Sequence, residues 1–213
     1  MVGVRIDPAG LPFIVGGLVV AAAAWVAVGP VAAVPGLAIA LICLFFFRDP
    51  HRDVRAGVNE VLSPADGRVM IAGAPVGKTV PPGQWQQISI FLSPMDVHVN
   101  RIPIGGTVTH VEYHPGRFLP AYRTDAGDLN EHTEVHIDHG GQRFVVRQIV
   151  GLLARRVVCR IKTGAVVQTG DRFGVMKFGS RMDVFVPVDA TISVAVNDRV
   201  VAGVTVLARL TKV

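Results

Sequence analysis

A glycine-serine bond near the C-terminus is the most informative chemical feature of the chain. Because Gly179 precedes Ser180, the serine hydroxyl can attack the carbonyl of its own preceding residue, and glycine has no Cβ to obstruct the strained geometry. The attack needs a base to accept the hydroxyl proton and a group that orients this base. An isolated Gly-Ser dipeptide is more often an ordinary turn between strands, so the bond is informative only together with such partners.

Two residues earlier in the chain are candidates for these partners. An imidazole titrates near pH ~6.5 when unperturbed, which favours His98 as the general base. Asp66 would then hold the required tautomer of that ring. Each residue also has an ordinary interpretation, since Asp66 precedes Gly67 in a sequence typical of a turn and His98 could be a polar strand residue.

Three further residues are candidates for binding a substrate: His114, Arg155 and Arg156. An arginine pair can hold a phosphate group through bidentate hydrogen bonds. Adjacent strand residues face opposite ways, so only one of the two guanidinium groups would point into a site. Solvated surface charge is an equally good interpretation of these residues.

A cluster of histidines invites a metal-site interpretation. The segment 132–139 contains His132, His136 and His139 together with two acidic residues. In a strand the first two would share a face, whereas His139 would lie on the other face or in the turn at Gly140. A polar hairpin is the simpler interpretation, and we expect no metal site.

Short β-strands must position these residues. Runs of β-branched and aromatic residues alternate with turn signals such as Pro82-Gly83 and Gly140-Gly141. The expected strands are 68–72, 87–92, 107–114, 133–138, 143–150, 157–161, 182–186, 191–196 and 201–207. We therefore expect a mainly β fold, an antiparallel sandwich or barrel, in which residues 115–130 form an irregular, mobile loop at the site.

An apolar segment precedes the β domain. The 40 residues from Pro8 to Phe47 (47 − 7) carry no charged or polar side chain, and Gly29-Pro30 divides them into pieces at or just below the ~17–25 residues of a spanning helix. Arg5 and Arg48 flank the segment, which favours a membrane hairpin with both ends cytoplasmic. A hairpin buried in a soluble core is the alternative. A signal peptide is disfavoured because its apolar core would run only about 7–15 residues.

Charge and cysteine content limit the remaining classes of protein. The 213 residues carry a net charge of +5, all of it beyond Phe47, because Arg5 and Asp7 cancel. This charge suits an anionic membrane surface, and nucleic acid is disfavoured because no basic run with interleaved aromatic residues occurs. The two cysteines cannot form a disulfide framework, because one lies in the apolar segment and the other in the β domain.

Six motifs, in order, resemble the phosphatidylserine decarboxylase family, in its short archaeal-type branch. The motifs are Phe46-Phe47-Arg48-Asp49-Pro50, Leu62-Ser63-Pro64-Ala65-Asp66-Gly67, Phe91-Leu92-Ser93-Pro94-Met95-Asp96-Val97-His98-Val99-Asn100-Arg101, Tyr113-His114-Pro115-Gly116, Gly151-Leu152-Leu153-Ala154-Arg155-Arg156 and Gly170-Asp171-Arg172-Phe173-Gly174-Val175-Met176-Lys177-Phe178-Gly179-Ser180. The resemblance covers nearly the whole chain. It departs at Arg101, where some relatives carry a second histidine, so the residue that reprotonates the decarboxylated intermediate is left open.

The resemblance implies a proenzyme that cuts itself between Gly179 and Ser180. The products would be a β chain, residues 1–179, and an α chain, residues 180–213, whose first residue becomes a pyruvoyl group, the covalently bound pyruvate cofactor. That group would form a Schiff base with phosphatidylserine and release CO₂, giving phosphatidylethanolamine. Asp66 and His98 match the family's acidic and histidine positions in self-cleavage.

The resemblance also implies an organisation and a location. Residues 1–55 would anchor a catalytic domain, residues 56–213, at the cytoplasmic face of the cell membrane. The partners would be phosphatidylserine, the anionic membrane surface and the two chains of one precursor, alone or in a higher oligomer.

A second resemblance indicates a different class of protein. Glycine turns ahead of valine-bearing strands, together with Val175-Met176-Lys177, resemble the biotinyl/lipoyl carrier sandwich, in which Lys177 would be modified and the Gly179-Ser180 bond would stay intact. An uncleaved membrane-bound binding module is a third hypothesis. Neither alternative calls for Asp66, His98 and Ser180 together, so the decarboxylase is preferred.

Overall fold

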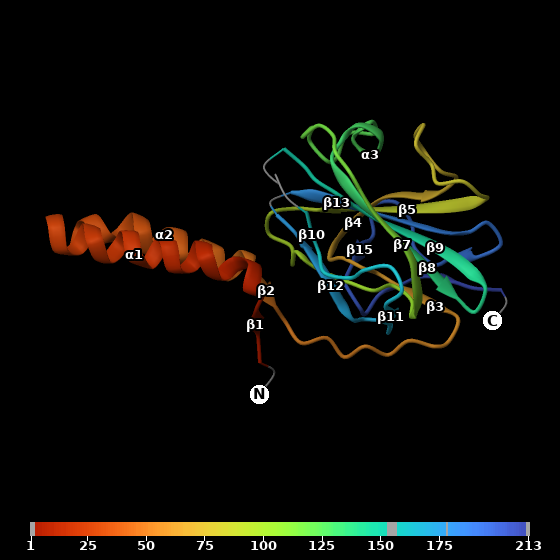
Figure 1. The fold of residues 1–213 in the computed structure, drawn as a ribbon, viewed down its shortest axis with the longest axis horizontal. Helices are drawn as coiled ribbons and strands as arrows, with labels where there is room; N and C mark the ends of the chain where they lie inside the picture. The colour runs from red at the N-terminus through yellow and green to blue at the C-terminus, as the bar shows by residue number, and fades with distance from the viewer. Residues whose placement is uncertain (1–2, 153–156, 178, 212–213) are drawn as a thin grey trace. The chain divides into compact units, whose positions relative to one another are not determined.

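The computed structural model describes residues 3–152, 157–177 and 179–211. The chain forms two compact units, Met1–His51 and Arg52–Val213 (Figure 1). The first unit is helical and the second is built almost entirely from antiparallel strands.

The first unit is a hairpin of two apolar helices. Helix α1, Leu11–Val28, ends at Gly29, whose φ of 121° suits glycine, and α2, Pro30–Phe46, begins at the next residue. Strands β1, Arg5–Ile6, and β2, Arg48–Asp49, pair antiparallel. The chain therefore leaves the hairpin at the end where it entered, as the sequence predicted.

Small residues allow the two helices to approach closely. A Cβ on Gly36 would lie 2.6 Å from the Ala21 nitrogen, and one on Gly17 would lie 3.0 Å from the Ala40 nitrogen. Such contacts are typical of helix pairs in membranes. The segment Pro8–Val28 is long and apolar enough to cross a membrane, whereas the second helix is shorter, so a membrane anchor is supported only by length and composition.

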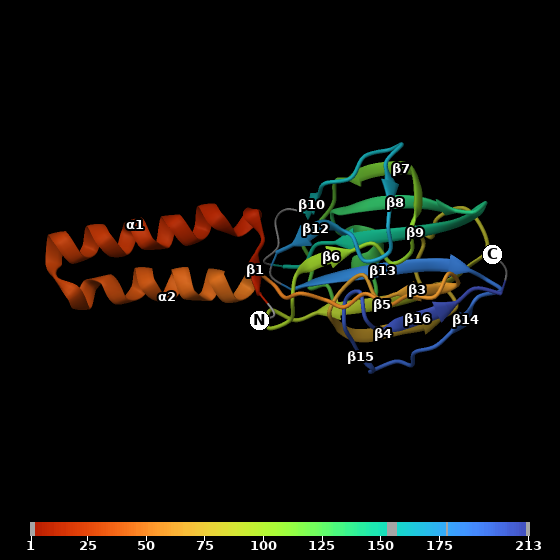
Figure 2. The same cartoon turned by 90° about the horizontal axis from the view of Figure 1, so that it is seen from below.

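An eight-stranded antiparallel sheet forms the centre of the second unit. In spatial order its strands are β11 Val166–Val167, β7 Gly106–His114, β8 His132–His139, β9 Gln142–Ile149, β13 Ser180–Pro187, β5 Trp85–Leu92, β4 Gly67–Gly73 and β15 Arg199–Val200. Figure 2 shows the long strands from β7 to β4 side by side.

Two three-stranded sheets and a short helix complete this unit. The sheets are β10 Val157–Cys159, β12 Arg172–Met176 and β6 Val99–Arg101, and β14 Thr191–Ile192, β16 Val206–Arg209 and β3 Glu60–Leu62. The helix is α3, Ala126–Leu129. The main architecture, mainly β with antiparallel pairing after an apolar hairpin, is confirmed.

The two faces of the large sheet are both buried but differ in chemistry. One face carries Ile90, Val146 and Val184, which belong to the hydrophobic core. Strand alternation directs the neighbouring residues to the opposite face, and there the buried side chains include six polar ones: Gln87, Ser89, Glu134, Arg147, Arg181 and Asp183.

The strand predictions were right for the long strands and wrong in detail for some others. Strand β7 does not alternate simply, because a bulge at Thr109 places both Val108 and Val111 against the core and turns His110 outward. The segment predicted as one strand at 201–207 is instead a turn, held by the bond from the Thr205 nitrogen to the Val201 carbonyl, followed by β16. The predicted loop at 115–130 contains α3.

Candidate active site

Ser180 is the first residue of β13 and is fully buried. It pairs with Leu92 of β5, so its backbone is fixed by the sheet. Its Oγ has no hydrogen-bond partner among the described residues. A buried hydroxyl without a partner is costly, so such groups usually have a chemical reason for their position.

The carbonyl that precedes Ser180 lies in unusually close contact with another glycine. Gly179 has a φ of 68°, in the left-handed region. A Cβ on Gly151 would lie only 1.8 Å from the Gly179 oxygen. Gly151, just beyond β9, is therefore required for this position of the Gly179 carbonyl.

His98 is fully buried in the segment between β5 and β6. Its carbonyl accepts a hydrogen bond from the Met176 nitrogen at 3.2 Å, and Met176 lies four residues before Ser180 in the sequence. Ring atom Nδ1 lies 2.9 Å from the Asp96 carbonyl. When Nδ1 donates to that carbonyl, Nε2 is the basic nitrogen of the ring.

Asp66 lies just before β4, on the other side of β5 from Ser180. Its Oδ2 forms a 2.7 Å ion pair with Arg52, and its Oδ1 accepts from the Ala202 nitrogen at 2.8 Å. Burial raises the pKa of this carboxyl above its usual value, and the Ala202 bond and Arg52 oppose that shift. The Asp96 carbonyl, not Asp66, lies beside His98 Nδ1 in this structure, and the part that Asp66 plays in holding the His98 tautomer stays a prediction.

A mainly apolar cavity of about 200 Å³ opens beside the Gly179-Ser180 bond. Its walls are Phe91, Pro94, Pro120, Ala121, Tyr122, Leu152 and Gly179. Three of these residues come from the 115–130 segment, which the sequence predicted to form a site loop. The Phe91 and Tyr122 rings meet edge to face at 6.2 Å, so this segment packs directly against β5.

Comparison with known proteins decides the family. The model of the family described as phosphatidylserine decarboxylase matches residues 39–208. The chain belongs to the phosphatidylserine decarboxylase family. A phosphatidylserine decarboxylase proenzyme of Solibacter usitatus is 44% identical over 186 residues, which are 87% of each chain. One of Magnetococcus marinus is 43% identical over 169 residues, 79% of this chain and 78% of that protein.

The candidate substrate-binding residues and the histidine cluster either do not line this cavity or lie outside the described residues. His114 ends β7 and stacks on His132, and it is not among the cavity walls. Arg155 and Arg156 lie outside the described residues. His132 and His136 share a face of β8, whereas the Nδ1 of His139 contacts the Gly105 carbonyl.

Sequence reasoning missed a buried ion pair next to the Gly179-Ser180 bond. Arg181, fully buried, donates from Nε to Asp183 at 2.6 Å and from Nη2 to the Ser89 hydroxyl at 3.1 Å. It also packs on Gly127, where a Cβ would lie 3.3 Å from Nη2. The signal was the i, i+2 spacing of an arginine and an aspartate directly after Ser180, which places both on one face of a strand.

Proposed function

We propose that this chain cuts itself between Gly179 and Ser180 and then decarboxylates phosphatidylserine to phosphatidylethanolamine and CO₂. The single observation that carries this proposal is the buried Ser180 hydroxyl, which follows a left-handed glycine and has no hydrogen-bond partner among the described residues, in a chain of the phosphatidylserine decarboxylase family. Sequence relatives named as proenzymes support the self-cleavage.

Self-cleavage begins with attack of Ser180 Oγ on the Gly179 carbonyl carbon, as the hydroxyl proton passes to His98. The C–N bond breaks, the nitrogen takes a proton, and the acyl group becomes an ester on Oγ. Loss of the Ser180 α-proton then expels the Gly179 carboxylate and leaves dehydroalanine. Water converts its enamine to a ketone with loss of ammonia, so the α chain begins with a pyruvoyl group.

The residues present fit such a group. The position is fully buried, its neighbouring carbonyl occupies the space that a Cβ on Gly151 would fill, and the oxygen at Ser180 has no competing donor among the residues described. The ketone would condense with a primary amine, and its conjugated carbonyl would accept the electron pair released as CO₂ leaves. Burial of the site keeps water from competing for this chemistry.

His98 is proposed to move protons in both stages. Arg101, at the position where some relatives carry a histidine, keeps its proton at all physiological pH values, and its Nη1 donates to the Gly170 carbonyl at 3.1 Å. It cannot serve as a general acid in this state. Asp66 is proposed to act through its carboxylate, which neutralises the charge of Arg52 near the site.

The apolar cavity and the helical hairpin both suit a lipid substrate. The cavity walls at Phe91, Pro120 and Tyr122 offer apolar surface beside Gly179. A hairpin with one helix long enough to span a membrane supports attachment to the cell membrane, with both ends on its cytoplasmic face. Solvated basic residues of the β domain would favour anionic lipids.

A carrier domain of biotinyl/lipoyl type is the weaker alternative. Lys177 is only partly exposed and directly follows β12, whereas a modified lysine must reach its partners freely. We retain the likeness of the β domain to the biotinyl/lipoyl sandwich as a proposal about its fold and not about its chemistry.

The test is CO₂ release from phosphatidylserine in mixed micelles by the purified full-length protein. Wild type should release CO₂, and Ser180→Ala should release none above the rate without protein. Activity that survives Ser180→Ala would disprove the proposed chemistry. An inactive wild type whose mass shows complete cleavage would disprove the proposed substrate.

A further inference from the structure

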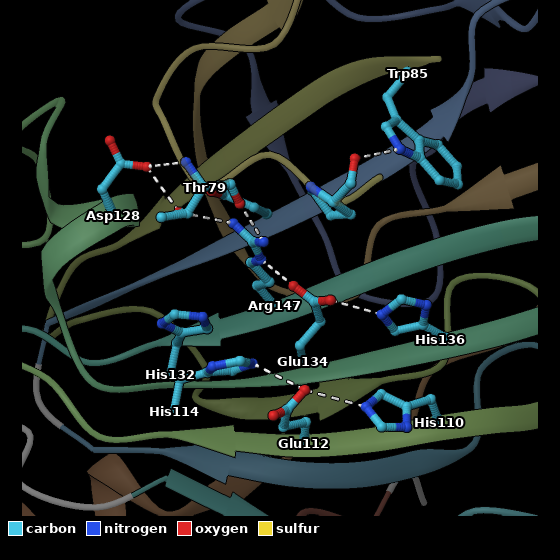
Figure 3. Close-up of polar contacts among 12 residues, drawn as sticks. Thr79, Trp85, His110, Glu112, His114, Asp128, His132, Glu134, His136 and Arg147 are labelled. Atoms are coloured by element: carbon cyan, nitrogen blue, oxygen red, sulfur yellow. Dashed lines mark hydrogen bonds and ion pairs between the residues drawn. The ribbon is translucent and has the colours of Figure 1, made fainter. Parts of the chain in front are cut away.

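Two neighbouring strands carry the same alternating pattern of histidine and glutamate. On β7 the pattern is His110, Glu112 and His114, and on β8 it is His132, Glu134 and His136. The antiparallel register places His110 opposite His136, Glu112 opposite Glu134 and His114 opposite His132. We call these six residues the His-Glu ladder. Figure 3 shows its side chains on one face of the two strands.

Three side chains at one end of the ladder converge. The candidate ligand atoms of His114, His132 and Glu134 lie within 4.8 Å of one another. The two imidazole rings stack with their centroids 4.6 Å apart and their planes 17° apart. Two nitrogen ligands and one carboxylate therefore lie close together on this face of the strands (Figure 3).

Neighbouring groups hold two of these side chains in place. The Nδ1 of His132 lies 2.9 Å from the Asn130 carbonyl, which leaves Nε2 for a metal. Metal-binding histidines usually donate their other ring nitrogen in this way. The Glu134 carboxylate contacts Arg147 through Oε2 and His136 through Oε1, so its orientation is also fixed.

We propose that His114, His132 and Glu134 bind one zinc ion. Two imidazoles and a carboxylate are typical zinc ligands, whereas magnesium and calcium prefer oxygen ligands alone. Zinc takes four ligands, so one position is left for water or for Glu112, whose Oε2 lies 3.5 Å from His114 Nε2. This site is separate from the Ser180 chemistry.

The position of the site suggests what the ion would do. His114 ends β7 and His132 begins β8, so the ion would join the two ends of the segment 115–131. That segment supplies Pro120, Ala121 and Tyr122 to the cavity beside Gly179. A hydrogen bond already joins the two ends of this segment, because the Arg117 nitrogen donates to the Leu129 carbonyl at 2.7 Å. Zinc would therefore act as a clasp that keeps this wall of the cavity in place.

The experiment is a zinc titration of the full-length protein, without a histidine tag and stripped of metal by a chelator. Calorimetry should give one ion per chain, and Co²⁺ should give the visible absorption of a tetrahedral site. His114→Asn and His132→Asn should each weaken binding by more than the about 10- to 100-fold that loss of an outer-shell partner costs. His110→Asn, on the same strand and face, is the matched control: its ring contacts Glu112, so its loss should weaken binding by no more than that outer-shell amount.

Several results would overturn the proposal. One is the absence of saturable binding near one ion per chain, and another is an equal loss of affinity in His110→Asn. If His132→Asn does not fold, the zinc affinity of the His114→Asn variant alone tests the site, because the His114 side chain is partly exposed. The clasp is tested by trypsin cleavage after the exposed Arg123, which zinc should slow in wild type and not in His114→Asn. Equal cleavage with and without zinc would refute the clasp even if the ion binds.

Discussion

Gly151 lies so close to the Gly179 carbonyl that it cannot carry a side chain without moving that carbonyl, whereas Gly179 is constrained by its φ of 68°. The Gly151 contact reaches 1.8 Å for an added Cβ, so an alanine there must shift the Gly179 oxygen by more than an ångström. Displacements of that size cost on the order of 10²-fold in rate when a reacting atom is moved.

Gly151→Ala is therefore expected to slow self-cleavage by on the order of 10²-fold or more. The uncut fraction of freshly made protein, followed over time on a denaturing gel, measures this. Gly57→Ala is the control, because its Cβ would meet only the Glu60 side chain at the ordinary distance of 3.5 Å. Normal cleavage in a folded Gly151→Ala variant would refute the role given to this contact.

Asp66 yields a prediction about pH. Its pKa is raised in the folded state, chiefly by burial, so the folded state favours the protonated form. The stability from this group is therefore present below the unfolded pKa of about 3.9 and is lost as pH rises through the higher folded value. Asp66→Asn should gain in melting temperature relative to wild type as pH rises from 3 to 7, even though Arg52 loses its partner.

Thermal melting of both proteins in the uncut Ser180→Ala background measures this difference. A relative loss of stability with rising pH would show that the Arg52 ion pair outweighs burial. If Asp66→Asn is stable at pH 7 in that background but fails to cut itself when Ser180 is present, the defect lies in the chemistry rather than in folding.

At the scale of the elements, the start of β13 depends on the buried pair of Arg181 and Asp183. Asp183→Asn leaves the guanidinium buried beside a neutral group and should cost about 3–5 kcal/mol of unfolding free energy. Arg181→Met combined with Asp183→Leu removes both charges and should cost much less. Chemical denaturation of the uncut Ser180→Ala form measures both, and equal losses would contradict this account.

The helical hairpin depends on close packing between its glycines and alanines. Gly36→Leu should force the helices apart, because even a Cβ would lie 2.6 Å from the Ala21 nitrogen. Gly16→Leu is the matched control, since nothing lies within 4 Å of its Cβ position. Circular dichroism in detergent should show a lower melting temperature for the first variant alone, and equal melting would show that the contact is unimportant.

The sequence predicted the long strands and the hairpin because each depends on local pattern. The cut at Gly179-Ser180 stays a prediction. The sequence did not indicate β3, β6 and β12, which are short and lack clear alternation. The pairing of Asp66 with Arg52 and the contact of Gly151 with Gly179 join distant parts of the chain. Neither can be read from local spacing, and both required the three-dimensional structure.

At the scale of the whole molecule, cleavage would leave the two chains interwoven. The α chain would have 34 residues (213 − 179) and would contribute β13, which lies between β9 and β5 of the β chain. Strand β16 would likewise pair with β3. Two chains from one precursor should therefore stay together without a covalent link.

The most direct test is the denatured intact mass of the full-length protein after purification under native conditions. The account predicts two masses in equal amounts, one for residues 1–179 and one for residues 180–213. The smaller mass should be lower than that of a serine-initiated fragment by one ammonia. A single uncut chain of 22.7 kDa would contradict the account.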